Sequence, residues 1–395
     1  MTPVQHHSAT RTHERLPPFR SFWMTAFDSA DHARGLREAL DLLQYRRRVE
    51  ADYRAVRDAG IACVRESIDW RRAARDDRFD FTTVALRAEC ARRVDLQIVW
   101  TLCNAGAPEG IDVCSGAFVD RFRAFAKAAA RVTTQSSDAA PPVYVPIDEI
   151  SFQSFAIAET GLFGEQRREL HLRGRDVMRQ LVRATLAACD AILEVEPRAR
   201  FLHTEPVVNA PRAGTEDSRE RNRQFDVWDM LAGRLDRELG GHPRYLDIAG
   251  IHHHYIDPRW RGAAAPDGTI AGDATRFALH RLLEEVHARY GRPLVVCETN
   301  HVSAVRATWL RELGDEIGEA LMRGIPVLGA CLCRAVERPT WEDPRYWRGR
   351  RLWDRLLQSD DDSPRVPDSA YGRALRDVQA RIDPLLVDPQ RRHSP

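Results

Sequence analysis

Lysine, net charge and long apolar runs are all scarce in this sequence. Almost all of its 59 basic residues are arginines, with Lys127 a rare lysine, and its 58 acidic residues leave a formal net charge of only +1. Such a balance gives no signal for a nucleic-acid or acidic-membrane partner. No run of about 18 apolar residues occurs, so we expect no membrane span. Residues 1–18 lack the apolar segment of a secretory signal, so we expect a disordered N-terminal tail and a cytoplasmic protein.

The sequence also lacks paired cysteine motifs and glycine-rich phosphate loops. Several of its eight cysteines lie inside apolar, strand-like runs, where a thiol behaves as a small hydrophobe. Cys331 and Cys333 have no second cysteine pair nearby, which argues against a structural zinc site. Without a secretory signal, we expect reduced thiols. An open doubly wound sheet usually has a glycine-rich first turn, and neither that turn nor a P-loop is present.

The sequence does have a regular alternation of short apolar runs with amphipathic stretches. The apolar runs predict strands at residues 19–27, 61–68, 96–103, 143–147, 200–203, 246–251, 294–297 and 326–332. The amphipathic stretches predict helices at residues 45–59, 82–93, 117–132, 168–194, 217–239, 275–290, 308–322 and 370–386. This alternation indicates an α/β protein, a single (β/α)₈ TIM barrel over residues 19–386, followed by a C-terminal tail at 387–395.

Polar side chains are concentrated where the predicted strands end. In a (β/α)₈ barrel these positions share one face, and that face carries the active site. Two carboxylates stand out: Glu149 follows the fourth strand and Glu298 ends the seventh, and we expect them to face each other across the barrel mouth. The candidate substrate contacts around them are Asp28, His32, Arg65, Trp70, Asn104, Asp148, His203, Glu205, His252, His254, Asn300 and Trp341.

A pair of carboxyl groups on one face is what cleavage of a glycosidic bond requires. One must be protonated to help the leaving group depart, and the other must be ionised to attack or stabilise the anomeric carbon. Retaining enzymes hold the two groups about 5–5.5 Å apart. Arg65, at the end of the second strand, would keep Glu298 ionised and leave Glu149 as the proton carrier. Either glutamate alone is more simply read as a solvated side chain, but the two together predict a glycosidase.

Several segments around these residues resemble one group of glycosidases. Tyr144–Ser151 (YVPIDEIS) is similar to a strand-four signature that holds an acid/base glutamate, and Val296–Thr299 (VCET) is similar to a strand-seven nucleophile segment. Over about residues 19–353 the chain resembles clan A glycoside hydrolases, most closely a family 1-like bacterial β-glucosidase group. The resemblance implies a retaining barrel enzyme with Glu149 as acid/base and Glu298 as nucleophile. It also implies a small glycoside or oligosaccharide as partner, and neither metal nor organic cofactor.

The chain departs from that group in the residues that contact sugar. Asp148 stands where the group has an asparagine for the sugar 2-hydroxyl, Asn104 stands in place of a histidine, and His252–His254 (HHH) replaces Asn-Tyr-Tyr. The extra carboxylate of Asp148 would favour a cationic group near C2, so an amino or otherwise modified sugar is one hypothesis. Pairing of Asp148 with an arginine is the simpler alternative. A catalytically silent carbohydrate-binding barrel is a further alternative.

The three histidines also raise the alternative of a metallohydrolase. His252 and His254 are two residues apart in a strand-like stretch, so their side chains would share a face, and His203 or Glu205 would complete a zinc-type site. We expect instead that these rings hydrogen-bond ligand hydroxyls or the nucleophile. The sequence specifies neither the sugar nor the oligomeric state.

Overall fold

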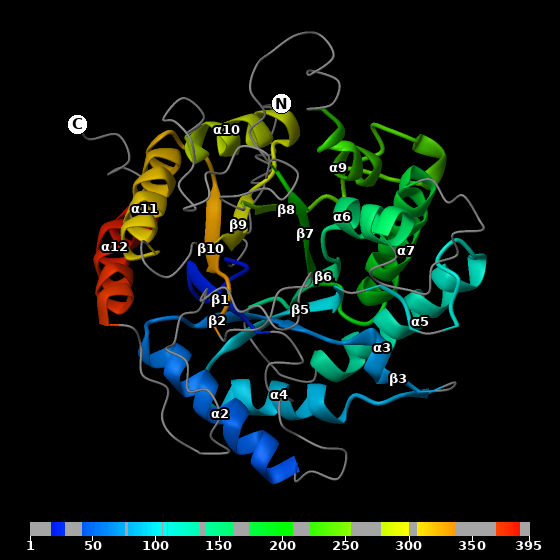
Figure 1. The fold of residues 1–395 in the computed structure, drawn as a ribbon, viewed down its shortest axis with the longest axis horizontal. Helices are drawn as coiled ribbons and strands as arrows, with labels where there is room; N and C mark the ends of the chain where they lie inside the picture. Colours follow the sequence, from blue (N-terminus) through cyan, green and yellow to red (C-terminus); the bar gives the residue numbers. More distant parts are fainter. Residues whose placement is uncertain are drawn as a thin grey trace, which may run out of the picture.

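The chain folds around a closed barrel of eight parallel strands (Figure 1). The computed structural model describes residues 17–27, 42–75, 78–104, 106–108, 110–134, 140–160, 174–207, 222–253, 278–299, 306–335 and 369–387. In order round the barrel the strands are β1 (Trp23–Phe27), β2 (Cys63–Ser67), β5 (Gln97–Cys103), β6 (Val143–Ile147), β7 (Arg200–Pro206), β8 (Ile248–His252), β9 (Leu294–Thr299) and β10 (Val327–Leu332). Residues 23–25 of β1 pair with residues 330–332 of β10, which closes the barrel and confirms the predicted fold.

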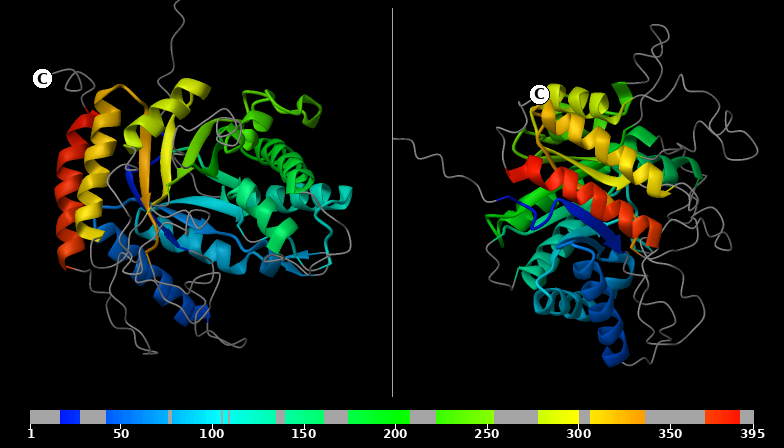
Figure 2. Two further views of the ribbon diagram at one scale, coloured as in Figure 1. Left: turned by 45° about the horizontal axis from the view of Figure 1, so that its top comes forward. Right: turned by 90° about the vertical axis from the view of Figure 1, so that its left-hand side faces the viewer.

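Helices surround the barrel on its outer side (Figures 1 and 2). They are α2 (Leu42–Asp58), α4 (Thr82–Arg93), α5 (Gly116–Thr133), α7 (Gly174–Leu193), α9 (Asp226–Leu231), α10 (Leu279–Tyr290), α11 (Arg306–Met322) and α12 (Ser369–Val387). Figure 2 shows α11 and α12 side by side along one wall. None of the described helices combines the length and apolarity that a membrane span requires.

Helix α5 shows how the sequence directs a helix onto the barrel. Ser115 caps its start by accepting a hydrogen bond from the backbone N–H of Phe118, at 3.2 Å. Phe118, Phe122 and Phe125 are spaced along one helical face, and all three are fully buried. Small residues on the same side, such as Ala126, allow close packing against α7. The amphipathic pattern therefore becomes the helix–barrel interface.

A separate cluster of apolar side chains fills the inside of the barrel. Every barrel strand contributes to this interior cluster, whose strand members are Met24, Cys63, Val99, Val143, Val145, Leu202, Ile248, Val295, Cys297 and Cys331. Their strand neighbours, such as Val64 and Ile251, belong instead to the core under the helices. Side chains therefore alternate between barrel interior and helix layer, as strand geometry requires.

Most of the predicted elements are present, with small shifts at their ends. The helix predicted at 82–93 and the strand predicted at 143–147 have the predicted bounds. The long helix predicted at 217–239 is wrong in its described part, where α9 ends at Leu231 and a short 3₁₀ helix, η3 (Arg237–Leu239), follows. The predicted tails, residues 1–18 and 387–395, lie almost wholly outside the described residues.

Several short elements were not predicted. They are α3 (Trp70–Ala73), the hairpin of β3 (Ala74–Arg75) with β4 (Arg78–Phe79), α6 (Ile150–Phe155) and the π-helix η1 (Ala156–Thr160). Strands β6 and β9 are the fourth and seventh in the barrel, as predicted. They are separated by β7 and β8, so they are three positions apart in the ring of eight strands and do not stand diametrically opposite each other.

Candidate active site

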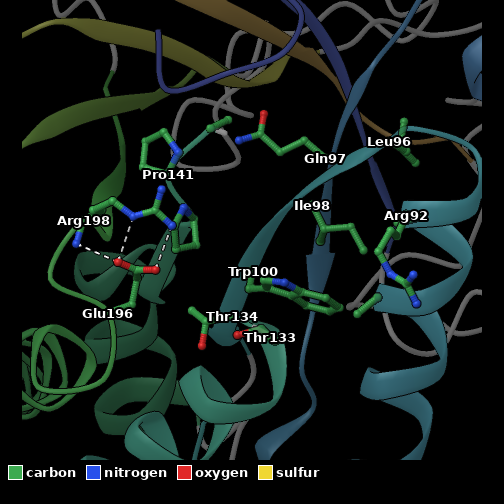
Figure 3. Close-up of a pocket in the computed structure, with 14 residues that line it drawn as sticks. Arg92, Leu96, Gln97, Ile98, Trp100, Thr133, Thr134, Pro141, Glu196 and Arg198 are labelled. Carbon is green, nitrogen blue, oxygen red and sulfur yellow. Dashed lines mark hydrogen bonds and ion pairs between the residues drawn. The ribbon is translucent and has the colours of Figure 1, made fainter. Parts of the chain in front are cut away.

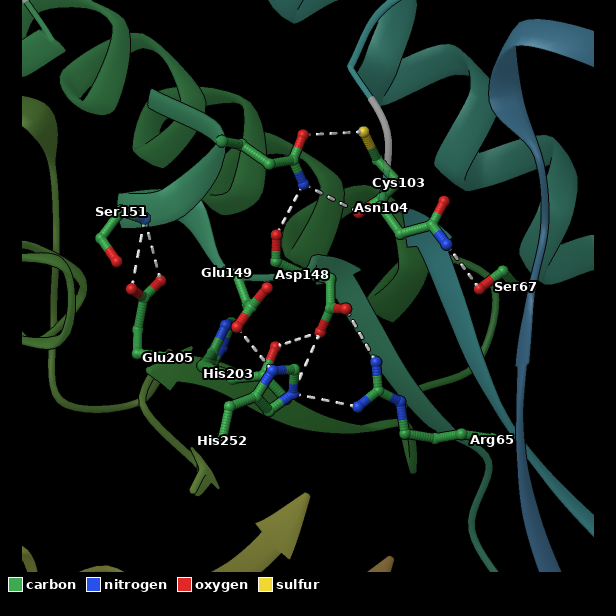
Figure 4. Close-up of polar contacts among 12 residues, drawn as sticks. Arg65, Ser67, Cys103, Asn104, Asp148, Glu149, Ser151, His203, Glu205 and His252 are labelled. Atoms are coloured by element: carbon green, nitrogen blue, oxygen red, sulfur yellow. Dashed lines mark hydrogen bonds and ion pairs between the residues drawn. The ribbon is translucent and has the colours of Figure 1, made fainter. Parts of the chain in front are cut away.

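Polar side chains meet at the carboxyl ends of four barrel strands, the consecutive strands β6, β7 and β8 and, across from them, β2 (Figure 4). Arg65 lies on β2, Thr204 on β7 and His252 on β8, each two or four residues beyond a member of the interior cluster. Strand alternation therefore directs all three into the barrel. Asp148 and Glu149 follow β6 directly. The structure thus brings together four of the predicted site residues: Arg65, Asp148, Glu149 and His252.

Asp148 is held by partners on three sides. Its Oδ2 accepts a hydrogen bond from Arg65 NH2 at 2.9 Å, and its Oδ1 accepts one from Thr204 Oγ1 at 2.6 Å. Its backbone N–H donates to the Cys103 carbonyl at 2.8 Å, and its own carbonyl accepts from Gln153 Nε2 at 2.6 Å. The pairing of Asp148 with an arginine, the simpler alternative from the sequence, is therefore what the structure contains. The salt bridge with Arg65 also compensates the negative charge of Asp148, which the ammonium group of an amino sugar would need as its partner.

His252 connects this ion pair to Glu149. The ring is fully buried, with Nε2 at 3.1 Å from Arg65 NH1 and 3.6 Å from Asp148 Oδ1. Its other nitrogen, Nδ1, lies 2.8 Å from Glu149 Oε1. A single imidazole therefore contacts three of the charged side chains at the barrel mouth.

Glu149 has an unusual backbone conformation. Its φ of 47° and ψ of 59° fall in the left-handed region, which costs a residue other than glycine about 1–2 kcal/mol. Its N–H donates to the Thr204 carbonyl at 3.1 Å, and its carbonyl accepts from Gln153 N at 2.8 Å, which starts α6. The Glu149 side chain remains 18% exposed, in contrast to the buried His252 beside it. The strained turn therefore presents a carboxyl group at the mouth of the barrel, a location where strain is commonly associated with function.

Glu298 lies on β9, and its side chain is outside the described part of the structure. Its backbone is in register with that of His252 on β8. His252 thus contacts Glu149 and is also the strand neighbour of Glu298. The described contacts of Arg65 are with Asp148 and His252, so its predicted role of keeping Glu298 ionised stays a prediction.

Glu205 is more deeply buried than a substrate contact would be. Only 1% of its surface is exposed, and its carboxyl oxygens accept from the backbone N–H of Ser151 at 3.2 and 3.4 Å. Burial, together with the negative charge of nearby Glu149, raises the pKa of Glu205 to about 8. At neutral pH it is therefore a protonated carboxyl packed beside the turn at Glu149. This placement argues against the predicted direct contact between Glu205 and a sugar.

His203 and Trp70 also point away from the mouth. His203 Nε2 donates to the Tyr245 carbonyl at 2.7 Å, and burial lowers the pKa of His203 to about 4. Trp70 is 2% exposed and packs against Phe118, Phe122 and Phe125 of α5. Their predicted sugar contacts are not supported, because both side chains belong to the layer between barrel and helices.

The remaining predicted contacts are only partly placed. Asn104 follows β5 and donates through Nδ2 to Ser67 Oγ at 2.9 Å, which puts it near the end of β2. Five predicted contacts lie outside the described residues: Asp28, His32, His254, Asn300 and Trp341.

Two residues that support the site were missed by the sequence analysis. Thr204 binds Asp148, and its position two residues after Leu202 is the alternation signal that would have found it. Gln153 donates to the Asp148 carbonyl, and through Oε1 it accepts from Gly106 N at 3.2 Å. No sequence pattern marks Gln153, because α6 is too short to show a helical period.

The structure gives the metal alternative no support within its described residues. No group of three or more potential ligands converges in those ranges. His252 Nε2 contacts Arg65 and its Nδ1 lies beside Glu149, whereas His203 points into the helix layer. The two histidines therefore do not share a site.

A hollow lies at the opposite end of the barrel from the residues of the candidate site (Figure 3). It is lined by residues at the amino-terminal end of β5, including Gln97 and Ile98, and by the loops before β6 and β7. The charged groups Glu196 and Arg198 at its rim pair with each other. Active sites of (β/α)₈ barrels lie at the carboxyl ends of the strands, so this hollow is not the candidate site.

The comparisons with known proteins concern the fold. No protein-family model matches the chain, and no curated protein matches its sequence. A β-glycosidase from Pyrococcus horikoshii is similar in structure, with a TM-score of 0.69 and 13% identity over 96% of this chain and 99% of that one. A family 1 β-glucosidase from Thermotoga maritima gives a TM-score of 0.67 and 13% identity over 91% and 98%. The β-glycosidase BGL167 gives 0.62 and 17% over 85% and 87%. The chain therefore has the barrel fold of family 1 β-glycosidases at a large distance in sequence.

Proposed function

We propose that the protein is a retaining O-glycoside hydrolase with Glu149 as acid/base and Glu298 as nucleophile. One observation carries the proposal: His252 contacts the Glu149 carboxyl at 2.8 Å and is in backbone register with Glu298. Glu149 follows β6 and Glu298 lies on β9, so both glutamates lie at the carboxyl end of the barrel, with β7 and β8 between their strands. The fold shared with β-glycosidases supports the same assignment.

The proposed reaction has two steps. In the first, Glu149 gives its proton to the glycosidic oxygen while the carboxylate of Glu298 attacks the anomeric carbon and displaces the aglycone. In the second, Glu149 takes a proton from water, whose oxygen attacks the anomeric carbon and releases Glu298. Atoms balance, because the proton given in the first step is recovered from water in the second.

We propose a neutral small glycoside or oligosaccharide as the substrate. A Thermotoga maritima β-glucosidase has been solved with deoxynojirimycin and with glucoimidazole, both sugar-like ligands. In this chain the carboxylate of Asp148 already accepts from Arg65 and Thr204. An ammonium group at C2 would have to compete with the guanidinium of Arg65, which makes an amino sugar the weaker hypothesis.

The proposal is tested with a mechanism-based trap. A panel of 2-deoxy-2-fluoro aryl glycosides should form a stable glycosyl-enzyme, and peptide mass mapping should find the label on Glu298. Glu298→Gln should abolish labelling. Glu149→Gln should lower turnover of glycosides with poor leaving groups by about 10²–10⁴. Turnover of that variant with activated leaving groups should recover on adding azide, which attacks without needing a general base.

The control and the contrary outcomes are distinct. Glu194→Gln changes an exposed glutamate that pairs with Arg123 and Lys127, and it should leave labelling and turnover unchanged. Sugar binding without any labelling would instead favour a catalytically silent carbohydrate-binding barrel. The salt bridge between Asp148 and Arg65, at the position where the glycosidases that the chain resembles have a sugar-contacting asparagine, is the observation that favours this second candidate. Activity that is lost to a chelator would revive the metallohydrolase alternative.

A further inference from the structure

We propose that Arg65 holds His252 as the neutral tautomer protonated at Nδ1, and that this N–H determines which oxygen of Glu149 carries the catalytic proton. His252 would then be a positioning residue, acting on the reaction through Glu149. The role in catalysis rests on the proposed function of Glu149. The tautomer itself is a property of the folded protein, with or without turnover.

The first step of the argument concerns Nε2 of His252. It lies 3.1 Å from Arg65 NH1, and a guanidinium has only donors, so Nε2 must accept. A proton on Nε2 would place two N–H groups against each other. Asp148 Oδ1, the described carboxyl oxygen on this side of the ring, lies 3.6 Å from Nε2, which is beyond hydrogen-bond distance. Asp148 Oδ2 also holds Arg65 NH2 at 2.9 Å, which fixes the direction of the guanidinium.

The second step concerns the other ring nitrogen. A neutral imidazole carries one proton, so with Nε2 accepting, that proton is on Nδ1. Nδ1 lies 2.8 Å from Glu149 Oε1. In this structure the ring N–H is not aligned with Oε1 and makes no hydrogen bond to it. Hydrogen bonds of catalytic groups commonly align only when a ligand binds, and the proposal places this one there. Oε1 is then the accepting oxygen, and the proton for the leaving group belongs on Oε2.

The third step concerns the charges around the ring. The positive charge of Arg65 on β2 opposes a second proton on His252. The carboxyl groups of Asp148 and Glu149, beside β6, favour such a proton. Glu298 on β9 is the strand neighbour of His252. The salt bridge with Arg65 compensates the charge of Asp148. Once Glu149 has given up its proton, the same Nδ1–H contact becomes charge-assisted and therefore stronger. His252 thus stabilises the carboxylate that must next act as a base.

The tautomer is tested directly by NMR on the full-length protein labelled with ¹⁵N-histidine. At pH 7, long-range ¹H–¹⁵N spectra should show for His252 a protonated Nδ1 and a bare Nε2, with the signals assigned by their loss in His252→Asn. His203 provides an internal reference of opposite type, because its Nε2 donates to the Tyr245 carbonyl. An imidazolium at position 252, or a proton on its Nε2, overturns the proposal whether or not the protein turns over a glycoside.

Matched substitutions then test the effect on Glu149. His252→Asn keeps an N–H near the position of Nδ1, His252→Gln places its amide toward Arg65 and removes the donor from Glu149, and His252→Leu removes both groups. For an active enzyme, the alkaline limb of kcat/KM should move to higher pH by about one unit in the Gln and Leu variants. It should stay in place in the Asn variant.

The outcomes separate this inference from the proposed function. An equal shift in all three variants shows a merely structural ring and overturns the positioning role. Absence of turnover by the unaltered protein contradicts the proposed function, while the NMR result still decides the tautomer.

Discussion

At the scale of single residues, Glu205 is a buried carboxyl whose protonation should change the stability of the fold. Burial and the charge of Glu149 raise the pKa of Glu205 to about 8, well above its usual value of 4.5. Between these two values the folded protein keeps the proton while the unfolded chain releases it. The free energy of unfolding therefore falls as pH rises through this window, by about 3 kcal/mol at pH 7.

Glu205→Gln should remove this dependence, because an amide does not titrate and its oxygen still accepts from Ser151. Denaturant unfolding at pH 5 and pH 7 should show the variant gaining about 2.5 kcal/mol relative to the unaltered protein between the two values. Glu194→Gln, at an exposed position, is the matched control and should show no such gain. Parallel pH dependence of Glu205→Gln and the unaltered protein would show that Glu205 is ionised in the fold.

The sequence predicted part of this site for a physical reason. Residues at or just past the carboxyl ends of strands meet on one face of a barrel, which brought Arg65, Asp148, Glu149 and His252 together. His203 is not among them, because β7 extends to Pro206, three residues beyond its predicted end. It is therefore inside the strand, on the side that faces the helices. Because the strand was predicted to end too early, a residue inside it was taken for one at the barrel mouth, and boundaries are what sequence alone gives least well.

At the scale of elements, strand β8 depends on the glycine in its middle. A Cβ at Gly250 would lie 2.7 Å from Cys297 Sγ, 2.8 Å from Thr204 Cγ2 and 3.0 Å from Leu202 Cδ1. These atoms belong to the interior of the barrel, which leaves no room for an added methyl group. The missing side chain therefore lets β8 pack beside β7 and β9 and present His252 at its end.

Gly250→Ala should destabilise the protein by about 1–3 kcal/mol in denaturant unfolding, the usual cost of overpacking a filled core. The double variant with Cys297→Ala should recover part of this loss, because the sulfur is the nearest atom. Gly116→Ala is the control, since a Cβ there meets nothing within 4 Å at the start of α5. Equal losses at Gly250 and Gly116 would contradict the packing argument.

The wrongly predicted helix at 217–239 has a similar explanation. Gly233, just past the end of α9, has a φ of 72°, and a Cβ on it would lie 2.4 Å from the carbonyl oxygen of Gly241. A helix cannot continue through that conformation. Gly233 is thus the C′ glycine of α9, and Arg234 N donates back to the Asp229 carbonyl at 2.8 Å. The apolar spacing of the sequence continues past Gly233, and the prediction followed that spacing instead of the glycine.

At the scale of the whole molecule, barrel closure was the most predictable property, because it follows from eight repeats of one strand–helix pattern. The pairing of β1 with β10 is the longest connection in the sequence and completes the interior. The resemblance to one glycosidase group was likewise visible in the order of its segments. The side chain of Glu298 lies outside the described structure, so its role stays a prediction.

The eight cysteines fall into two groups according to their exposure to solvent. Seven are buried, among them Cys63, Cys297 and Cys331 of the interior cluster, and Cys114 is exposed. A thiol-specific reagent should therefore modify one cysteine, Cys114, in the native protein. The reaction should be faster at alkaline pH, because partial loss of solvent around the sulfur and the nearby Asp112 raise the pKa of its thiol. The other seven should react only on unfolding. Fast modification of more than one thiol in the native protein would contradict this arrangement.

Thiols inside the barrel can meet a reagent only if the ring of strands separates. At high reagent concentration, a thiol that becomes exposed is modified before the barrel closes again. The labelling rate of Cys63, Cys297 and Cys331 then equals the rate at which the barrel opens. At low reagent concentration, the labelling rate reports the equilibrium population of the open form. The sulfur atoms that fill the core thus double as native reporters of its kinetic stability, readable by mass spectrometry without an added probe.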